Sequence, residues 1–172
     1  MARSSLYFVA LTPEASFTRF IRKLQQEMCD QFGVCHALRT PPHITLVPPF
    51  RALADQEVDL NKALLSISFD SFQLPILGMG RFGKRVIFVK PEVNPELKLL
   101  HTSAQKAFEL WSKPEQRPFH PHFTIGYRDL EPVFLKAWKH FEAHDIPSEM
   151  CIENIVLFKY QEKRWEILTK KF

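Results

Sequence analysis

The sequence predicts a mixed α and β domain that is built of two related lobes. Apolar, β-rich runs alternate with stretches in which apolar residues recur at helical spacing, and no low-complexity linker separates them. The pattern Pro-His-x-Thr also occurs once in each half of the chain. We expect the 172 residues, 1–172, to form a single domain of two lobes, because a chain of this length usually folds around one core.

The N-terminal part predicts a strand followed by two helices. Residues 5–11 form a short apolar run rich in β-formers. Thr12 and Pro13 have the residue types of a helix N-cap and first helical position. The helix that they begin buries a face with Phe17, Phe20, Ile21, Leu24 and Met28. A second helix is predicted over about residues 55–66, with Val58, Leu60, Leu64 and Ile67 as its apolar positions.

The middle of the chain predicts two paired strands and a helix. The strands cover residues 72–79 and 85–90, and residues 80–84, which include two glycines, form the turn between them. Asn94 and Pro95 then begin a third helix. Its apolar face comprises Leu97, Leu100, Ala104, Phe108 and Trp111.

The C-terminal part predicts a strand, a helix and a hairpin. The strand covers residues 120–127. The helix is marked by Val133, Phe134, Ala137, Trp138 and Phe141. Residues 149–160 and 165–169 then pair as a hairpin across the turn 161–164.

Composition excludes several classes of protein. Sixteen Phe residues and a 45% hydrophobic fraction exclude intrinsic disorder. No apolar run approaches the roughly 20 residues of a membrane span, and the first five residues, Met-Ala-Arg-Ser-Ser, lack a signal-peptide pattern. The net charge of +4 permits an anionic substrate but is too small for a surface that coats duplex nucleic acid. We expect a monomer that engages neither a membrane nor duplex nucleic acid.

The cysteines indicate a reducing compartment. Cys29, Cys35 and Cys151 are too few and too scattered for a disulfide framework or a Cys-x-x-Cys metal site. We therefore expect three reduced thiols in a cytoplasmic protein.

The repeated pattern is the strongest functional signal. Its copies are Pro42-His43-Ile44-Thr45-Leu46 and Pro121-His122-Phe123-Thr124-Ile125. With 13 Pro, 7 His and 7 Thr in the chain, chance predicts about 0.02 copies of Pro-His-x-Thr. Side chains alternate along a strand, so the His and Thr of each copy share one face while the apolar residues face the other side. If the two halves are related by a pseudo-two-fold axis, both polar faces meet in one cleft.

Two imidazoles and two hydroxyls in one cleft suit phosphoryl chemistry. Histidine has an ordinary pKa near 6.5, so one imidazole can deprotonate an attacking oxygen while the other protonates the leaving oxygen. Each proton transfer typically contributes about 10²- to 10⁴-fold, and threonine hydroxyls can donate to the phosphate oxygens. No carboxylate accompanies either histidine within the motif, so we expect neither a metal ion nor another cofactor.

At these residues the chain resembles the 2H phosphoesterase superfamily, which is defined by two His-x-Thr/Ser-x motifs. HITL at 43–46 and HFTI at 122–125 match both motifs. The stretch FHPHFTI at 119–125 is similar to the second motif of the LigT-like RNA 2′,3′-cyclic phosphodiesterases, also called 2′-5′ RNA ligases. Gly80-Arg81-Phe82 followed by Arg85-Val86-Ile87 resembles that family's central strand pair.

The resemblance implies a fold, a substrate and a role for each motif residue. The expected fold is α+β, with two pseudo-symmetric lobes of antiparallel sheet and outer helices around a central cleft. The expected substrate is a nucleotide or RNA end. His122 would activate water, His43 would protonate the leaving ribose oxygen, and Thr45 and Thr124 would bind the phosphate. A 2′,3′-cyclic end would give a 2′-phosphate, and the reverse reaction, 2′-5′ RNA ligation, is chemically possible.

Four other residues are candidate substrate contacts. His120 would share a face with His122, as a residue at the cleft rim or as part of a His-x-His metal pair for which no third ligand is evident. Phe50 and Phe82 could stack on a base or belong to the core. Arg128 follows the second motif, as an arginine often does in LigT-like proteins, and is a candidate phosphate contact. The remaining histidines are expected to be solvated, namely His36, His101, His140 and His144.

Two alternatives to cyclic-phosphate hydrolysis stay open. The same chemistry could act on another small phosphodiester, such as a 2′-5′-linked oligonucleotide or an ADP-ribose cyclic phosphate. The cleft could also hold nucleotides or RNA ends without turnover, although a binding module has no need for two imidazoles.

Overall fold

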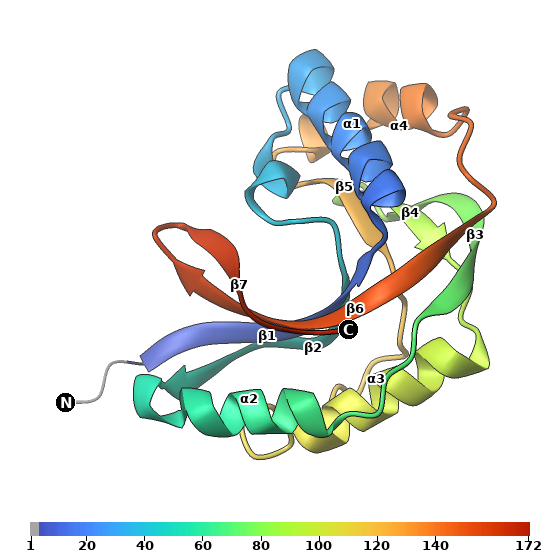
Figure 1. The fold of residues 1–172 in the computed structure, drawn as a ribbon. Coiled ribbons are helices and arrows are strands. Elements are labelled where there is room, and N and C mark those ends of the chain that lie inside the picture. The colour runs from blue at the N-terminus through green and yellow to red at the C-terminus, as the bar shows by residue number, and fades with distance from the viewer. Residues whose placement is uncertain (1–3) are drawn as a thin grey trace.

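A computed structural model describes residues 4–172, whose seven strands form one curved antiparallel sheet (Figure 1). The strand order is β2-β1-β6-β3-β4-β5, and β7 pairs with β6 off this path. The strands are β1 (Ser4–Pro13), β2 (Ile44–Leu53), β3 (Phe72–Phe82), β4 (Val86–Pro91), β5 (Phe123–Tyr127), β6 (Glu149–Gln161) and β7 (Arg164–Lys171). The α-helices are α1 (Ala15–Phe32), α2 (Glu57–Ser66), α3 (Pro95–Ala107) and α4 (Phe134–Phe141). Short 3₁₀ turns are η1 (His36–Arg39), η2 (Ala54–Gln56) and η3 (Glu131–Val133).

The sequence predicts neither a membrane span nor a signal peptide. No helix within residues 4–172 is both long enough and apolar enough to cross a bilayer. Met1, Ala2 and Arg3, which belong to the stretch that was inspected for a signal peptide, lie outside the described residues.

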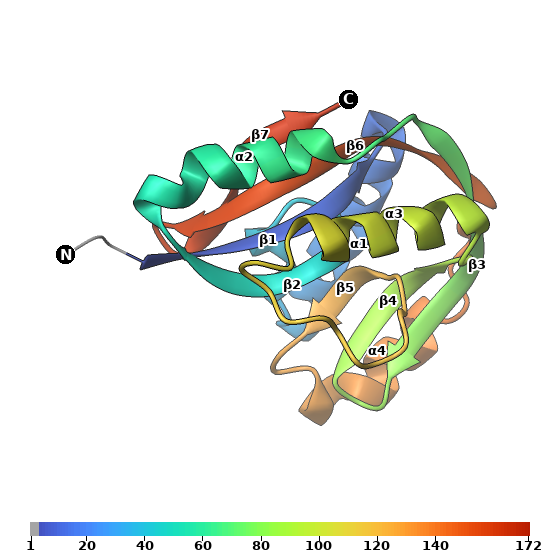
Figure 2. The same ribbon diagram turned by 90° about the horizontal axis from the view of Figure 1, so that it is seen from below.

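The long strand β6 joins two lobes. It pairs with β3 at its start, along residues 149–152, and with β1 and β7 along the rest of its length. Helices α2 and α3 cover β1, β2, β6 and β7, whereas α1 and α4 accompany β3, β4 and β5 (Figures 1 and 2). The predicted fold class, an α+β arrangement of two lobes of antiparallel sheet with outer helices, is confirmed.

The prediction for the start of the first helix is wrong. Thr12 and Pro13 belong to β1, where they pair with Asn154 and Ile152 of β6 and are buried. Strand pairing on both sides extends β1, so that α1 begins only at Ala15, and its N-cap position carries no side-chain hydrogen bond. Tertiary pairing therefore overrides the local capping signal.

The prediction for the third helix is confirmed. The Asn94 side chain accepts a hydrogen bond of 2.9 Å from the backbone N–H of Leu97, and Pro95 occupies the first helical position. The predicted second helix also forms, with the first residues of its range in the turn η2.

The turns are shorter than predicted because the strands continue into them. Gly80, Arg81 and Phe82 pair with β4, and the turn of the hairpin begins at Gly83, whose φ of 56° lies in the left-handed region. In the C-terminal hairpin, the two turn residues are Glu162 and Lys163. Both have positive φ, as tight two-residue hairpin turns require.

A shared hydrophobic core fixes the two strands that carry the His-x-Thr motifs. Phe123 of β5 packs on Phe17 of α1, with ring centroids 5.2 Å apart. Phe50 of β2 packs on Phe108, just after α3, at 5.7 Å. All four rings are buried, so each motif strand is pressed against one helix.

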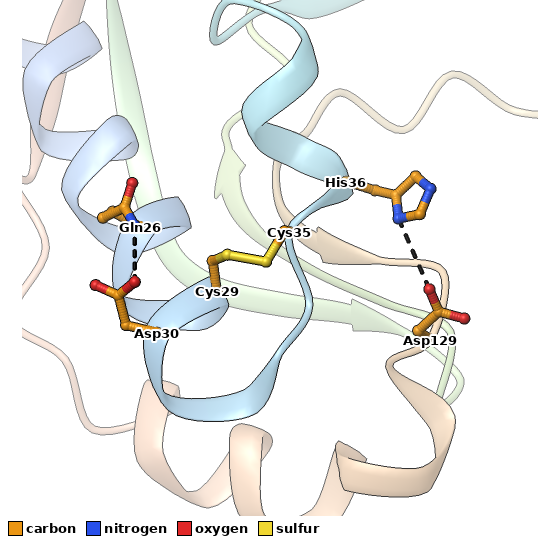
Figure 3. The surroundings of a disulfide bond; sticks show 6 residues. All are labelled: Gln26, Cys29, Asp30, Cys35, His36 and Asp129. Atoms are coloured by element: carbon orange, nitrogen blue, oxygen red, sulfur yellow. Dashed lines mark hydrogen bonds and ion pairs between the residues drawn. A yellow bond between two sulfur atoms is a disulfide. The ribbon is translucent and has the colours of Figure 1, made fainter.

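The prediction of three reduced thiols is wrong for Cys29 and Cys35, which form a disulfide (Figure 3). Helix α1 ends at Phe32, and Gly33 in the left-handed region, with φ of 71°, reverses the chain. The reversal places Cys35 beside the last turn of α1, with the two Cα atoms 4.5 Å apart. Counting cysteines could not reveal this turn. Cys151 is free, as expected.

Breaking the disulfide should destabilise the protein moderately. A bridge that closes a loop this short is expected to contribute about 2 kcal/mol to the free energy of unfolding. We expect Cys29→Ser/Cys35→Ser to lower the urea-unfolding free energy by that amount, whereas Cys151→Ser, away from the bridge, should change it little. Three free thiols in the native protein by thiol titration under non-reducing conditions would contradict the bond.

Candidate active site

The two His-x-Thr motifs line one cavity although their strands lie at opposite ends of the sheet path. β2 and β5 are the outermost strands of that path. The sheet curves so that His43, Thr45, His122 and Thr124 all line a cavity of about 270 Å³. The expectation that the two polar faces meet in one cleft therefore agrees with the structure.

The two motifs have the same alternation of burial. Pro42, Ile44 and Leu46 are buried while His43 and Thr45 between them are partly exposed. The second motif repeats this pattern from Pro121 to Ile125. In each copy the apolar residues anchor the strand in the core, and the two polar side chains are left to the cavity.

Both imidazoles are held by the same hydrogen bond. His43 donates from Nδ1 to the backbone carbonyl oxygen of Pro41 at 2.7 Å, and His122 donates from Nδ1 to that of His120 at 2.7 Å. A carbonyl can only accept, so Nδ1 carries the proton and Nε2 is the nitrogen left for chemistry. The bond to the residue two positions earlier also fixes each ring's orientation, which the sequence pattern alone did not indicate.

Burial keeps both imidazoles neutral in the free protein at pH 7. The pKa of His43 is lowered to about 4, mainly by desolvation and to a smaller extent by the neighbouring His122 and Arg22, while the hydrogen bond to Pro41 opposes the change. Desolvation also lowers the pKa of His122, assisted by His120. Both sites therefore favour the neutral ring until an anion arrives.

Aromatic rings form the walls around each histidine. The His43 ring lies 5.0 Å from Phe8 and 5.8 Å from Phe158. The His122 ring lies 5.0 Å from Phe82 and 5.3 Å from Phe88. These rings exclude water from one side of each imidazole, which is the physical origin of the desolvation.

Two glutamines, which the sequence did not single out, hold the open edges of the motif strands. Gln25 of α1 donates from Nε2 to the backbone oxygen of Thr124 at 2.9 Å, and Gln105 of α3 donates to that of Leu46 at 2.7 Å. Gln25 is 3% exposed and itself accepts a hydrogen bond from Arg22. Each motif strand pairs with only one other strand, so these bonds satisfy carbonyls on an edge without a strand partner. A glutamine on a helix that bonds to a strand edge produces no periodic pattern in the sequence, so this contact could not be predicted.

The structure places the other candidate substrate contacts in different surroundings. Phe82 is 37% exposed and its ring centroid lies 5.0 Å from that of His122, but Phe82 does not line the cavity. His120 is exposed with its ring centroid 6.3 Å from that of Phe82, and it does not line the cavity, so its place at the rim stays a prediction. Phe50 is 5% exposed and packs between Tyr7 and Phe108, so the base-stacking hypothesis is wrong for it.

Arg128 lies outside the cavity that the two His-x-Thr motifs line. It is exposed, has a φ of 53°, and lines a second cavity of about 300 Å³. The two cavities share Thr40, Tyr127 and Trp165 as lining residues. Arg128 could therefore reach an extended ligand but does not line the cavity that contains the motif residues.

The remaining four histidines, which were expected to be solvated, are partly exposed, and each also contacts a side chain distant in the sequence. His36 is 22% exposed and lies 3.8 Å from a carboxylate oxygen of Asp129. His101 stacks on Phe119 with ring centroids 3.9 Å apart, and burial lowers its pKa. His140 and His144 each place Nε2 near a carboxylate oxygen of Glu27, close to the C-terminal end of α1. Long-range packing, which local sequence context does not show, covers part of each of the four side chains.

The catalytic cavity offers few donors for a metal ion. Its lining contains two imidazoles and several hydroxyls but neither a carboxylate nor a thiol. The expected absence of a metal among the motif residues stays a prediction.

Comparison with known proteins points to one family. Residues 12–164 match the family model described as the 2′-5′ RNA ligase superfamily. A protein of Bacillus cytotoxicus named as a candidate phosphoesterase is 28% identical over 137 residues, which cover 77% of this chain and 78% of that protein. A protein of Bacillus cereus strain B4264 with the same description is 33% identical over 137 residues, with the same coverage.

A solved structure supports the fold. The crystal structure of E. coli LigT complexed with 3′-AMP superposes with a TM-score of 0.66 over 98% of each chain, at 19% sequence identity. LigT has also been solved in complex with NADP⁺ and with ATP, with TM-scores of 0.60 and 0.63.

Removing either glutamine bond should destabilise the sheet edge it satisfies. Gln25→Met and Gln105→Met keep the length of the side chain and leave a backbone carbonyl unpaired, so each should lower the free energy of unfolding by about 1–3 kcal/mol. Gln26→Met is the matched control, because Gln26 is exposed and bonds only to Asp30. If urea titrations give all three variants the same free energy of unfolding as the unaltered protein, the edge bonds contribute nothing to stability.

Proposed function

The chain belongs to the 2′-5′ RNA ligase superfamily, and on this basis we propose that it hydrolyses 2′,3′-cyclic phosphates of nucleotides or RNA 3′ ends. Membership of the superfamily and similarity to relatives named as candidate phosphoesterases support a phosphoesterase. The observation that carries the finer proposal is the pair of imidazoles in one cavity, each fixed through Nδ1 so that Nε2 is free.

The proposed reaction is an in-line displacement at phosphorus. One imidazole accepts a proton from water as the water oxygen bonds to phosphorus. The bond from phosphorus to the ribose O3′ breaks, and the second imidazole gives its proton to that oxygen. The product is a 2′-phosphate, and the two rings return to their starting states by exchanging a proton with solvent. Thr45 and Thr124 donate hydrogen bonds to the non-bridging oxygens, on which charge accumulates.

The surroundings of the rings favour His43 as the base and His122 as the acid. His43, whose pKa is lowered to about 4, is neutral near pH 7. A bound phosphodiester is an anion and raises the pKa of both imidazoles. The cationic Arg22 lowers the pKa of His43 and is not among the causes that lower the pKa of His122, so His122 takes up the proton more readily. These roles are the reverse of those that the family resemblance implies, in which His122 activates water and His43 protonates the leaving ribose oxygen.

The cavity suits a single nucleotide end. Its volume of about 270 Å³ lies near the lower limit of small-molecule sites. Tyr127 and Trp165 line it and offer aromatic faces for a base or ribose. The LigT complexes with 3′-AMP, ATP and NADP⁺ support a nucleotide ligand.

Substitution of the two histidines tests the proposal. We expect His43→Gln and His122→Gln each to lower kcat on 2′,3′-cyclic AMP by about 10²- to 10⁴-fold, because each removes one proton transfer. His101→Gln is the control, since His101 stacks on Phe119 outside the cavity. Assays run in EDTA report whether the activity needs a metal ion. Undiminished turnover by the double variant His43→Gln/His122→Gln would overturn the mechanism.

A substrate panel tests the proposed substrate against its alternatives. 2′,3′-cyclic mononucleotides and RNA with a cyclic 3′ end should have higher kcat/KM than a 2′-5′-linked oligonucleotide or ADP-ribose cyclic phosphate. Phosphorus NMR of the products should show a 2′-phosphate. Binding of every nucleotide with no product would instead indicate a binding module.

The pH dependence follows from the lowered pKa values. The base must be neutral, so kcat/KM should fall as pH drops toward about 4, the pKa of His43. The acid must be protonated, so kcat/KM should also fall as pH rises through the pKa of His122, which lies below 6.5. The maximum of kcat/KM is therefore expected below pH 6.5. The maximum of kcat is expected at a higher pH, because bound phosphate raises the pKa of both histidines. A maximum of kcat/KM above pH 7 would contradict this assignment.

A further inference from the structure

Three potential metal ligands converge where α1 meets α4, away from the catalytic cavity. Glu27 lies on α1, His140 on α4, and His144 one turn beyond His140. One donor atom from each, a carboxylate oxygen and two imidazole nitrogens, lies within 4.8 Å of the other two. Figure 1 shows the two helices at the same end of the molecule. None of the three residues lines the catalytic cavity.

The geometry of the cluster presents Nε2 of both histidines to the carboxylate. His140 Nε2 lies 2.5 Å from Glu27 Oε1, and His144 Nε2 lies 3.4 Å from Glu27 Oε2. His144 donates from Nδ1 to the backbone oxygen of His140 at 3.0 Å. That bond leaves the lone pair of its Nε2 available, which is the arrangement by which proteins orient a metal-binding imidazole.

The packing holds the histidines in place before any ion binds. The His140 ring lies 5.7 Å from Phe32 and 5.0 Å from Phe141, and the His144 ring stacks on Phe141 at 5.0 Å. The side chains of Glu27, His140 and His144 are 22%, 33% and 23% exposed. The cluster is thus ordered yet open to solvent, so that an ion can enter and water can complete its coordination.

The donor set selects the chemical class of the ion. Two imidazole nitrogens and one carboxylate oxygen suit Zn²⁺ and its first-row neighbours, whereas Mg²⁺ and Ca²⁺ prefer oxygen ligands. Tetrahedral Zn²⁺ with bonds of about 2.0–2.1 Å separates its ligand atoms by about 3.3 Å. His144 Nε2 and Glu27 Oε2, at 3.4 Å, already have this separation, whereas His140 Nε2 lies 2.5 Å from the other oxygen, Oε1, and has to separate from it by about 1 Å more.

We propose that Glu27, His140 and His144 bind one divalent transition-metal ion of the zinc type, which ties α4 to α1. The ion replaces the direct contact between His140 and Glu27 with two metal bonds. The bound ion would act structurally, by holding α4 against α1. Helix α1 also carries Gln25, which bonds the strand of the second motif. The site is independent of the proposed catalytic reaction.

The test is metal binding by the full chain, freed of any affinity tag and stripped with EDTA. We expect ZnCl₂ to bind at one ion per chain in calorimetry and to raise Tm by about 5–10 °C at a hundred-fold excess over Kd. MgCl₂ should do neither. Glu27→Gln, His140→Gln and His144→Gln should each weaken Zn²⁺ binding at least 10-fold.

Two controls separate this site from the catalytic cavity and from loss of fold. His43→Gln/His122→Gln should bind Zn²⁺ like the unaltered protein, whatever its catalytic activity. In the unaltered protein, nitrogen NMR should show Zn²⁺ shifting the Nε2 signals of His140 and His144 and leaving those of His43 and His122 in place, so the result does not depend on any variant folding. Unchanged affinity in the three single variants, or shifts confined to the cavity histidines, would overturn the proposal. No binding would leave the cluster a plain ion pair and would overturn it equally.

Discussion

The curvature of the sheet is the constraint on which the candidate site depends. β2 and β5 end the strand path and are never hydrogen-bonded to each other, yet they line one cavity. Their placement rests on packing against helices: Phe123 on Phe17 and Phe50 on Phe108. Gln25 and Gln105 complete the arrangement by bonding the strands' open edges. Positioning of the histidines is therefore a property of the whole fold and of no single segment.

The local chemistry of the site is a consequence of that packing. Burial against Phe8 and Phe158 on one side and Phe82 and Phe88 on the other favours neutral imidazoles. The site therefore favours histidines without a positive charge, and under the proposed mechanism a bound phosphate raises the pKa of the imidazole that serves as the acid.

Much of the fold and of the candidate site could be predicted from local sequence patterns, whereas the rest depends on contacts between residues far apart in the chain. Alternation within HITL and HFTI correctly predicted which residues share a face, and Asn94-Pro95 correctly predicted a helix start. Thr12-Pro13 gave an equally good local signal that pairing with β6 overrides. Phe50 could not be assigned to core or cavity without knowing that Phe108 lies against it. The disulfide, the two glutamines and the Glu27–His140–His144 cluster each join residues whose neighbourhood arises only after folding.

The most direct test of the account is whether both histidines respond to one phosphate group. Nitrogen NMR of the imidazoles during a titration with 2′-AMP measures this without relying on turnover. The account predicts that the Nε2 signals of His43 and His122 shift together, with one dissociation constant, one ligand per chain, and a raised pKa for both rings in the complex. A response from one histidine alone, or two separate dissociation constants, would contradict the claim that the two motifs form a single catalytic site.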